Sequence, residues 1–301
     1  MGFMDFRGST KPGYEYALLV FLALLWGSSY LFIKIAVVDI PPVTLIAARV
    51  AIAAVFLLGV MHWRGERLPR EVRTWRMLFV QSLFNSTGAW TILAWGQQYV
   101  DSGLASVLNS TSPIFVFLIT AFFTRHESVS FFKLGGACMG VLGVVAIVGI
   151  DVLHGLGQQL AGQLAAISGA LLYAGAAIYG KRLSSLPATV TSAGTMIWAT
   201  VCLVPLSLFL EHPWTLAPSS QSTIAVIILA VFCTGVALLI YFRLVKTLGS
   251  MGVASQSYLR AGVGVILGGV FLGEQMTLIA GLGVGAALLG VVIINMPVRS
   301  K

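Results

Sequence analysis

The chain has 301 residues, of which 58% are hydrophobic and only 9% are charged. Soluble domains carry roughly 25% charged residues, so this composition excludes a soluble globular protein and predicts an integral membrane protein. The net charge of +8 would suit a nucleic-acid partner, but basic residues also set membrane topology, so their positions decide between the two.

Ten apolar runs follow one another along the chain, each close to the length of about 20 residues with which a helix crosses a bilayer. They cover residues 16–37, 43–62, 77–98, 104–124, 132–150, 160–180, 190–210, 222–242, 252–272 and 276–296. The runs are continuously apolar and do not alternate between apolar and polar residues, which excludes long membrane strands. The predicted fold class is an all-α integral membrane protein with ten transmembrane helices.

Fifteen of the 18 Lys and Arg residues lie at the termini or in loops on one side of these spans, and none lies in the loops on the other side. The remaining three, Lys34, Arg49 and Arg260, lie within spans. Because cytoplasmic loops collect Lys and Arg, this distribution predicts a multi-pass protein of the inner membrane with cytoplasmic N- and C-termini. The positive charge is then an orientation signal, and a nucleic-acid partner is not expected.

An internal repeat relates the two halves of the chain. A shift of 147 residues carries Lys34 onto Lys181 (181 − 34 = 147), and it also aligns Leu25 with Leu172, Thr87-Gly88 with Thr234-Gly235, Glu127 with Glu274, Gly136 with Gly283 and Gly143 with Gly290. The predicted organisation is a cytoplasmic segment 1–15, two five-helix repeats at 16–150 and 160–296, and a cytoplasmic end 297–301. Because five is odd, the second repeat enters the membrane from the opposite face. Inverted repeats are typical of secondary transporters, which bind substrate in a central cavity between the repeats and expose it to each side in turn.

Several short stretches carry a resemblance to a known family. They are LLWGSSYLFIK in the first span, Pro42 with Arg49 in the second, NSTSPIF in the fourth, RHES and FLGEQMT after the fourth and ninth, and the glycine-rich fifth and tenth spans. Over nearly the whole chain they resemble the drug/metabolite transporter superfamily, in its ten-span EamA-type branch. The resemblance implies an exporter of amino acids, metabolites or drugs, or a relative that exchanges sugar phosphates or nucleotide sugars. The chain as a whole, rather than through any one motif, also resembles the YddG-type aromatic amino-acid exporters.

Polar and aromatic side chains within the spans are the candidate substrate contacts, because polar groups at bilayer depth need partners or water. They are Tyr30, Lys34, Asn85, Trp90, Asn109, Ser110, Tyr173, Gln256, Tyr258 and Arg260. Arg260 stands where the family usually has proline, and we expect it either to bind an anionic group such as a carboxylate or to hold a structural contact. Lys34 is near the outer end of its span, where it could reach the interface, another helix or the substrate. The aromatic rings could stack on an apolar or aromatic substrate.

A second set of residues is assigned to movement or structure: the hinge or packing positions Pro113, Gly88 and Gly235, and the structural positions Arg49, Glu127 and Glu274. Pro113 removes a backbone hydrogen bond and is expected to kink the fourth span. The long side chain of Arg49 is expected to reach the outer interface or to donate to backbone carbonyls at a helix end. Small residues such as Gly88 and Gly235 let neighbouring helices approach closely.

All ten acids and all four histidines lie in loops or at span ends. Ion coupling commonly uses an intramembrane carboxylate or histidine, so uncoupled export or exchange is expected, without a metal or another cofactor. No catalytic motif is present, so an enzyme is not expected, and a lipid scramblase or a receptor is less favoured than a transporter.

The predicted activity is export of amino acids, aromatic or hydrophobic ones favoured, with an anion or sugar-phosphate exchanger or a drug exporter as alternatives. The expected partners are a small-molecule substrate and the lipid bilayer, with a monomer favoured over a homodimer.

Overall fold

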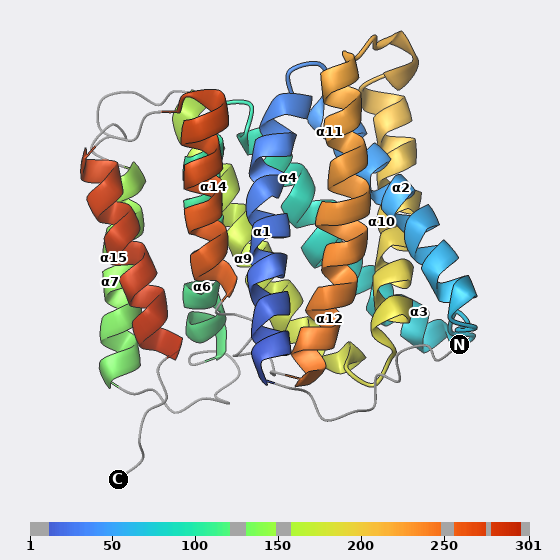
Figure 1. Ribbon diagram of the computed structural model, residues 1–301, viewed down its shortest axis with the longest axis horizontal. Helices are drawn as coiled ribbons and strands as arrows, with labels where there is room; N and C mark the ends of the chain where they lie inside the picture. The colour runs from blue at the N-terminus through green and yellow to red at the C-terminus, as the bar shows by residue number, and fades with distance from the viewer. Residues whose placement is uncertain (1–11, 121–130, 149–157, 248–255, 275–277, 296–301) are drawn as a thin grey trace.

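The computed structural model describes residues 12–120, 131–148, 158–247, 256–274 and 278–295, and within these ranges it contains helices and turns but no strand. The helices run side by side, across the longest dimension of the molecule (Figure 1). Within these ranges six helical stretches, some of them made of two or three consecutive elements, are long and apolar enough to cross a bilayer, and shorter apolar helices accompany them. The chain is an all-α membrane protein, as its composition predicted.

The first half of the chain forms α1 (Pro12–Ala36), α2 (Pro42–Trp63), α3 (Val72–Ser82), η1 (Leu83–Ala89), α4 (Trp90–Gly96), α5 (Ser102–Asn109), α6 (Ser112–Ile119) and α7 (Phe131–Val148). The third span is thus one continuous run of α3, η1 and α4, in which η1 is a π-helix. The fourth span is broken between α5 and α6, just before Pro113. Proline has no N–H and cannot complete the preceding turn. The hydroxyls of Ser110 and Thr111 donate to the carbonyls of Ser106 and Leu108 beside this break.

The second half forms α9 (Gln158–Gly180), η3 (Lys181–Leu183), α10 (Ala188–Leu210), η4 (Pro213–Thr215), α11 (Ser220–Ala230), η5 (Val231–Val236), α12 (Ala237–Thr247), α14 (Gln256–Leu272) and α15 (Leu278–Asn295). The eighth span repeats the design of the third, because α11, the π-helix η5 and α12 follow one another without a gap. Helices occupy all ten ranges in which spans were predicted. The first begins at Pro12, four residues before the predicted boundary.

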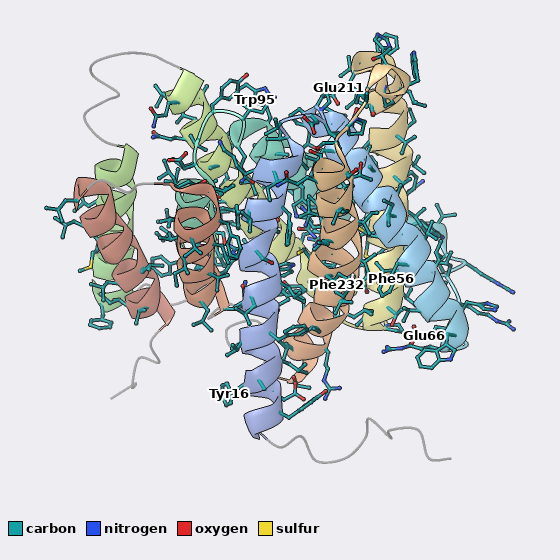
Figure 2. All side chains as sticks on the ribbon, turned by 45° about the horizontal axis from the view of Figure 1, so that its top comes forward. Tyr16, Phe56, Glu66, Trp95, Glu211 and Phe232 are labelled. Carbon is teal, nitrogen blue, oxygen red and sulfur yellow. The ribbon has the colours of Figure 1, made fainter. Side chains whose placement is uncertain are left out.

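The bundle has two ends, which we name after features that lie at each. The Lys34 end is where α1 and α4 finish and where α9 begins, since Gly96 of α4 packs against the backbone of Gly162 in α9. The linker end carries the connection 64–71 between α2 and α3. Figure 2 shows Tyr16 and Glu66 at the linker end and Trp95 and Glu211 at the opposite end. Helix α1 finishes where α9 begins, so the first helices of the two halves run in opposite directions.

Apolar packing among the described residues holds the bundle together, and the main core and one close helix pair illustrate it. The main core lies between α2, α10 and α11 and contains Leu45, Leu57, Met196, Leu203 and Leu229, all of which are fully or almost fully buried. At one edge, α7 and α15 form a close pair (Figure 1). This pair depends on glycine: a Cβ atom added to Gly290 would lie 2.5 Å from the backbone of Gly136 and of Gly140. Large apolar side chains such as Phe209 and Val201 are exposed on the outside of the helices, as a lipid-facing surface requires.

Candidate functional site

A buried polar layer lies between α1, α5 and α14. The Asn109 side-chain amide donates to the hydroxyl of Tyr30 over 2.7 Å, and Arg260 Nη2 lies 3.3 Å from the carbonyl oxygen of Asn109 and 3.5 Å from Ser110 Oγ. The helix break in the fourth span explains this arrangement, because α5 ends at Asn109 and its last carbonyls have no partner within the helix. No more than 6% of the surface of any of these four residues is exposed. The structure therefore brings together four of the side chains that the sequence singled out.

Several polar atoms of this layer, and of Gln256 one turn before Arg260 in α14, have no hydrogen-bond partner in the described parts of the chain. They are the Nε of Arg260, the Oδ1 of Asn109 and the Oε1 of Gln256, and all three are buried. A buried donor or acceptor without a partner costs about 1–3 kcal/mol, and more for a charged group. The layer thus presents one cationic donor and two amide acceptors, which a ligand with both an anionic and a donor group would satisfy.

A second guanidinium borders the polar layer on the side of α2. Arg49 is 3% exposed, its Cζ lies 4.1 Å from the centre of the Trp90 ring, and its Nε donates to Thr234 Oγ1 over 2.7 Å. The sequence led us to expect that Arg49 would reach the interface or backbone carbonyls, and this expectation was wrong. The aromatic face and the Thr234 hydroxyl hold the charge inside the bundle instead. Tyr173 lies close enough to interact electrostatically with both Arg49 and Arg260, and it also interacts with Trp90.

The two π-helices occupy corresponding positions in the two halves. Adding 147 to the bounds of η1, 83 and 89, gives 230 and 236, and η5 covers 231–236. In η5 the Thr234 hydroxyl donates to the carbonyl of Leu229, five residues earlier, so the oxygen that accepts from Arg49 also stabilises the widened turn. Single π-turns within α-helices are frequent at functional sites. The sequence analysis did not predict them, although the Thr-Gly pair that recurs at this shift was their visible signal.

Glycine is required in both π-helices. A Cβ atom on Gly88 would collide with the Leu83 carbonyl, and a Cβ atom on Gly235 would lie 2.8 Å from Cε1 of the Phe56 ring. The two glycines therefore serve close packing, in line with the role assigned to them. Their part in any hinge motion stays a prediction.

The remaining predicted site residues do not all join the layer. Lys34 lies apart from it, at the Lys34 end, where its Nζ donates to the carbonyls of Gln97 over 2.9 Å and Val100 over 2.7 Å. Asn85 is half-buried in η1. Tyr258 belongs to α14, but its side chain lies outside the described part of the structure, as does the whole of Glu127.

Carboxylates cap helix N-termini at the Lys34 end, and each comes from a distant part of the chain. Glu274 accepts from the backbone N–H groups of Ser102 and Gly103 at the start of α5, over 2.7 Å and 2.9 Å. Glu211, labelled in Figure 2, accepts from Val43 and Thr44 at the start of α2. Negative charge is stabilising at a helix N-terminus, because the N–H groups of the first turn have no partner within the helix. These caps support the structural role expected for Glu274 and tie the two halves together at one end.

Two further carboxylates at this end have shifted pKa values. Asp39 accepts hydrogen bonds from the hydroxyl and N–H of Ser219 and from the Ser222 hydroxyl, and these bonds hold its pKa below its ordinary value. Burial, and then the nearby charge of Glu274, raise the pKa of Asp101, while Lys34 acts in the opposite direction. The Lys34 end is therefore a network of backbone groups and charges.

Other features of the described residues lack the chemistry of a solute or metal site. No group of three or more His, Cys, Asp and Glu side chains in those ranges could hold a metal ion. A groove of about 400 Å³ lies on the surface of α2, lined by Ala51, Ile52, Val55 and Phe56. Its lining is entirely apolar, so it offers a solute no polar contact. The buried layer around Arg260 is the candidate site.

Comparison with known proteins agrees with this architecture. The model of the EamA-like transporter family matches residues 13–149 and again residues 160–296. The chain is similar to a protein named as the uncharacterized inner membrane transporter YedA of Escherichia coli, with 27% identity over 91% of this chain and 88% of the relative. It is also similar to the uncharacterized transporter YoaV of Bacillus subtilis, with 24% identity over 86% and 89% of the two chains, and to the protein PagO of Salmonella typhimurium, with 26% identity over 75% of each.

A solved crystal structure has the same fold. The alignment covers 94% of this chain and 98% of the solved chain, with a TM-score of 0.66 and 18% sequence identity. At that identity the likeness concerns the fold alone.

Proposed function

The chain belongs to the EamA-like transporter family, and from this premise we propose that it exports small carboxylate-bearing solutes, above all amino acids with apolar or aromatic side chains. Transport rather than catalysis is proposed because relatives such as YedA are named as transporters. The solute would move by alternating access, in which the two halves of the bundle expose one site to each side of the membrane in turn.

The partnerless groups of the polar layer carry this proposal. An α-amino acid has a carboxylate for the free Nε of Arg260, and an ammonium group for the amide oxygens of Asn109 and Gln256. The rings of Trp90 and Tyr173 border the same layer and offer a face to an apolar or aromatic side chain. A substrate of this kind would remove the cost of three unsatisfied buried groups at once.

The Lys34 end is proposed to face the outside of the cell, with the linker end and both termini in the cytoplasm of a cell with an inner membrane. The support is the distribution of Lys and Arg, which lie in loops and termini on one side of the spans. Transport is proposed to be facilitative or to proceed by exchange. The acids in the described part of the chain lie in loops or near helix ends, and none belongs to the polar layer.

Counterflow in proteoliposomes tests this function. Vesicles are loaded with an unlabelled aromatic amino acid, and uptake of the labelled compound is followed for wild type, Arg260→Gln and Arg260→Lys, with and without a pH gradient. Losing a hydrogen bond to a charged group costs about 1.5–3 kcal/mol, so we expect the Gln variant to lose about ten- to a hundredfold in kcat/KM and the Lys variant to retain part of it. Arg182→Gln, a change at an exposed arginine of η3, serves as the matched control.

The outcomes separate the parts of the proposal. Uptake that is independent of the pH gradient and is lost only in the Arg260 variants supports facilitative amino-acid export with Arg260 at the carboxylate. Uptake that requires the gradient contradicts the uncoupled mechanism. Equal uptake by wild type and Arg260→Gln removes Arg260 from the site.

An exchanger of organic anions is the second candidate, and one observation favours it. Arg49 and Arg260 are both buried, and the described residues place no carboxylate in the polar layer to balance them. Two uncompensated charges at this depth favour an anion and disfavour a cationic drug. Repeating the counterflow with the deaminated analogue of the aromatic amino acid, and with a sugar phosphate, distinguishes the candidates: preference for either anion over the amino acid would favour the exchanger.

A further inference from the structure

The side chain of Lys34 closes one end of the bundle. Its amine donates to two carbonyls, those of Gln97 and Val100, in the turn that follows α4. The C-terminal end of a helix carries partial negative charge, so both hydrogen bonds are charge-assisted. Lys34 therefore fastens the end of the first span to the end of the third.

The same end is also closed between α5 and α14. Gly264 and Gly268 of α14 lie so near the side chains of Ser106, Ser102 and Glu274 that neither position has room for a Cβ atom. The fourth and ninth spans are therefore in direct contact at both glycines, and the Lys34 contact joins the first and third spans at the same end. The structure thus describes a state in which the polar layer is closed off from that side.

The internal repeat predicts an equivalent contact at the linker end, and the structure does not form it. The shift of 147 carries Lys34 onto Lys181, and it carries the two acceptors onto Leu244 (97 + 147) and Thr247 (100 + 147). Both lie in the last turn of α12, where carbonyls have no intrahelical partner. Lys181 is exposed and its side chain makes no hydrogen bond within the described residues, although the side chain of its counterpart makes two.

The acceptors matter because they are backbone atoms. Gln97 corresponds to Leu244, so the side chains around the two contacts differ between the halves. A carbonyl acceptor does not depend on its side chain, and the lysine itself is present in both halves. The second contact is therefore chemically available even though it is unused in this state.

An inverted-repeat transporter reaches its opposite state when each half takes up the conformation of the other. We propose that Lys34 and Lys181 are positioning residues of the transport cycle, which act as alternating latches. Lys34 holds the bundle closed at the Lys34 end in the state described here. In the opposite state, Lys34 releases the end of the third span while Lys181 binds the carbonyls of Leu244 and Thr247 and closes the linker end. The inference rests on the proposed alternating access, but not on the identity of the solute.

A labelling experiment tests the latches without any substrate. Cys138, Cys202 and Cys233 are replaced by alanine, and Ser106→Cys is introduced as a reporter, since Ser106 is fully buried between α5 and α14. The purified protein in lipid nanodiscs is exposed to a bulky maleimide, which reaches the reporter only when the Lys34 end opens. Labelling rates are compared for Lys34→Ala, Lys181→Ala, the two Lys→Arg changes, and Arg182→Ala as an exposed neighbouring control.

The two lysines are expected to act on the same reporter with opposite sign. Losing one charge-assisted contact changes the ratio of the two states by on the order of tenfold. Lys34→Ala should therefore raise the labelling rate about tenfold and Lys181→Ala should lower it about tenfold, while the arginine variants and Arg182→Ala stay near the starting rate. A lysine that is merely solvated at the surface would not slow labelling at the far end of the molecule.

An unchanged or faster rate in Lys181→Ala overturns the proposal, whatever Lys34→Ala does. Because Lys181 is exposed, this variant is expected to fold, so the test stands even if Lys34→Ala is unstable. If the two variants shift labelling in opposite directions but the protein does not transport amino acids, the latch proposal stands and the proposed solute is rejected.

Discussion

Glu274→Gln is the sharpest test of how the Lys34 end is held. The Glu274 carboxylate receives two N–H groups from the first turn of α5, at 2.7 Å and 2.9 Å, although it lies 172 residues away in the sequence. Glutamine has nearly the same shape, but only one of its two terminal atoms accepts hydrogen bonds. The substitution therefore removes one charge-assisted bond and the negative charge at the helix N-terminus.

The expected cost follows from these contacts. A hydrogen bond to a charged group contributes about 1.5–3 kcal/mol, and a charge near a helix N-terminus adds about 0.3–1 kcal/mol. Part of this is offset, because Glu274 also repels Asp101, whose pKa is raised mainly by burial and further by that repulsion. A net loss of about 2 kcal/mol is expected, which lowers the Tm of a chain of this size by about 3 °C.

Thermal unfolding in detergent, followed by tryptophan fluorescence, measures this loss. Glu71→Gln is the matched control, because Glu71 is exposed before α3 and, among the described residues, its carboxylate accepts only a 3.4 Å hydrogen bond from the Thr74 hydroxyl. The control should melt within about 1 °C of wild type, as surface substitutions usually do. If Glu274→Gln also melts within that margin, the two bonds contribute nothing measurable and the account of this end is refuted.

Two further predictions concern packing and pH. Gly235→Ala should destabilise the protein by about 1–3 kcal/mol, because its Cβ would collide with the Phe56 ring, whereas Gly59→Ala, with open space around it, should be neutral or slightly stabilising in the same melting assay. Asp39 has a lowered pKa in the folded state, so its contribution to stability is complete above its ordinary value of 3.8 and is lost as the pH falls through the lower folded value. Asp39→Asn should accordingly melt below wild type at pH 7, and the two curves should converge on acidification below 3.8; a constant gap at all pH values would contradict this assignment.

The features that could be predicted from the sequence are those that depend on local chemistry. Continuous apolar runs identified the spans, since each needs only its own composition to be recognised. The break in the fourth span followed from Pro113, because a missing N–H acts on the residues immediately before it. Arg260 and Asn109 were singled out because a polar side chain in an apolar run needs a partner, and the structure makes them neighbours.

The contacts that the sequence left open join distant segments through backbone atoms. Three possible roles were left for Lys34 because its acceptors are carbonyls, which no side-chain pattern marks. The sequence offered Arg49 the outer interface or backbone carbonyls at a helix end, because nothing in it placed α2 against the π-helix η5. The π-helices themselves were missed because one inserted residue does not alter the composition of a continuously apolar run.

The contact between Arg243 and Glu15 has a counterpart of a different nature. Under the shift of 147, Arg243 corresponds to Gly96 and Glu15 to Gly162, so an ion pair of 2.8 Å at the linker end takes the place of two touching glycine backbones at the Lys34 end. Dissolved salt weakens the attraction between charges, less strongly where one partner is buried as Glu15 is, but it leaves the fit of two backbones almost untouched. Of these two matching contacts, the ionic strength of the solution therefore acts on the ion pair through its partly exposed Arg243, whereas the glycine contact at the Lys34 end depends on the shape of the two backbones.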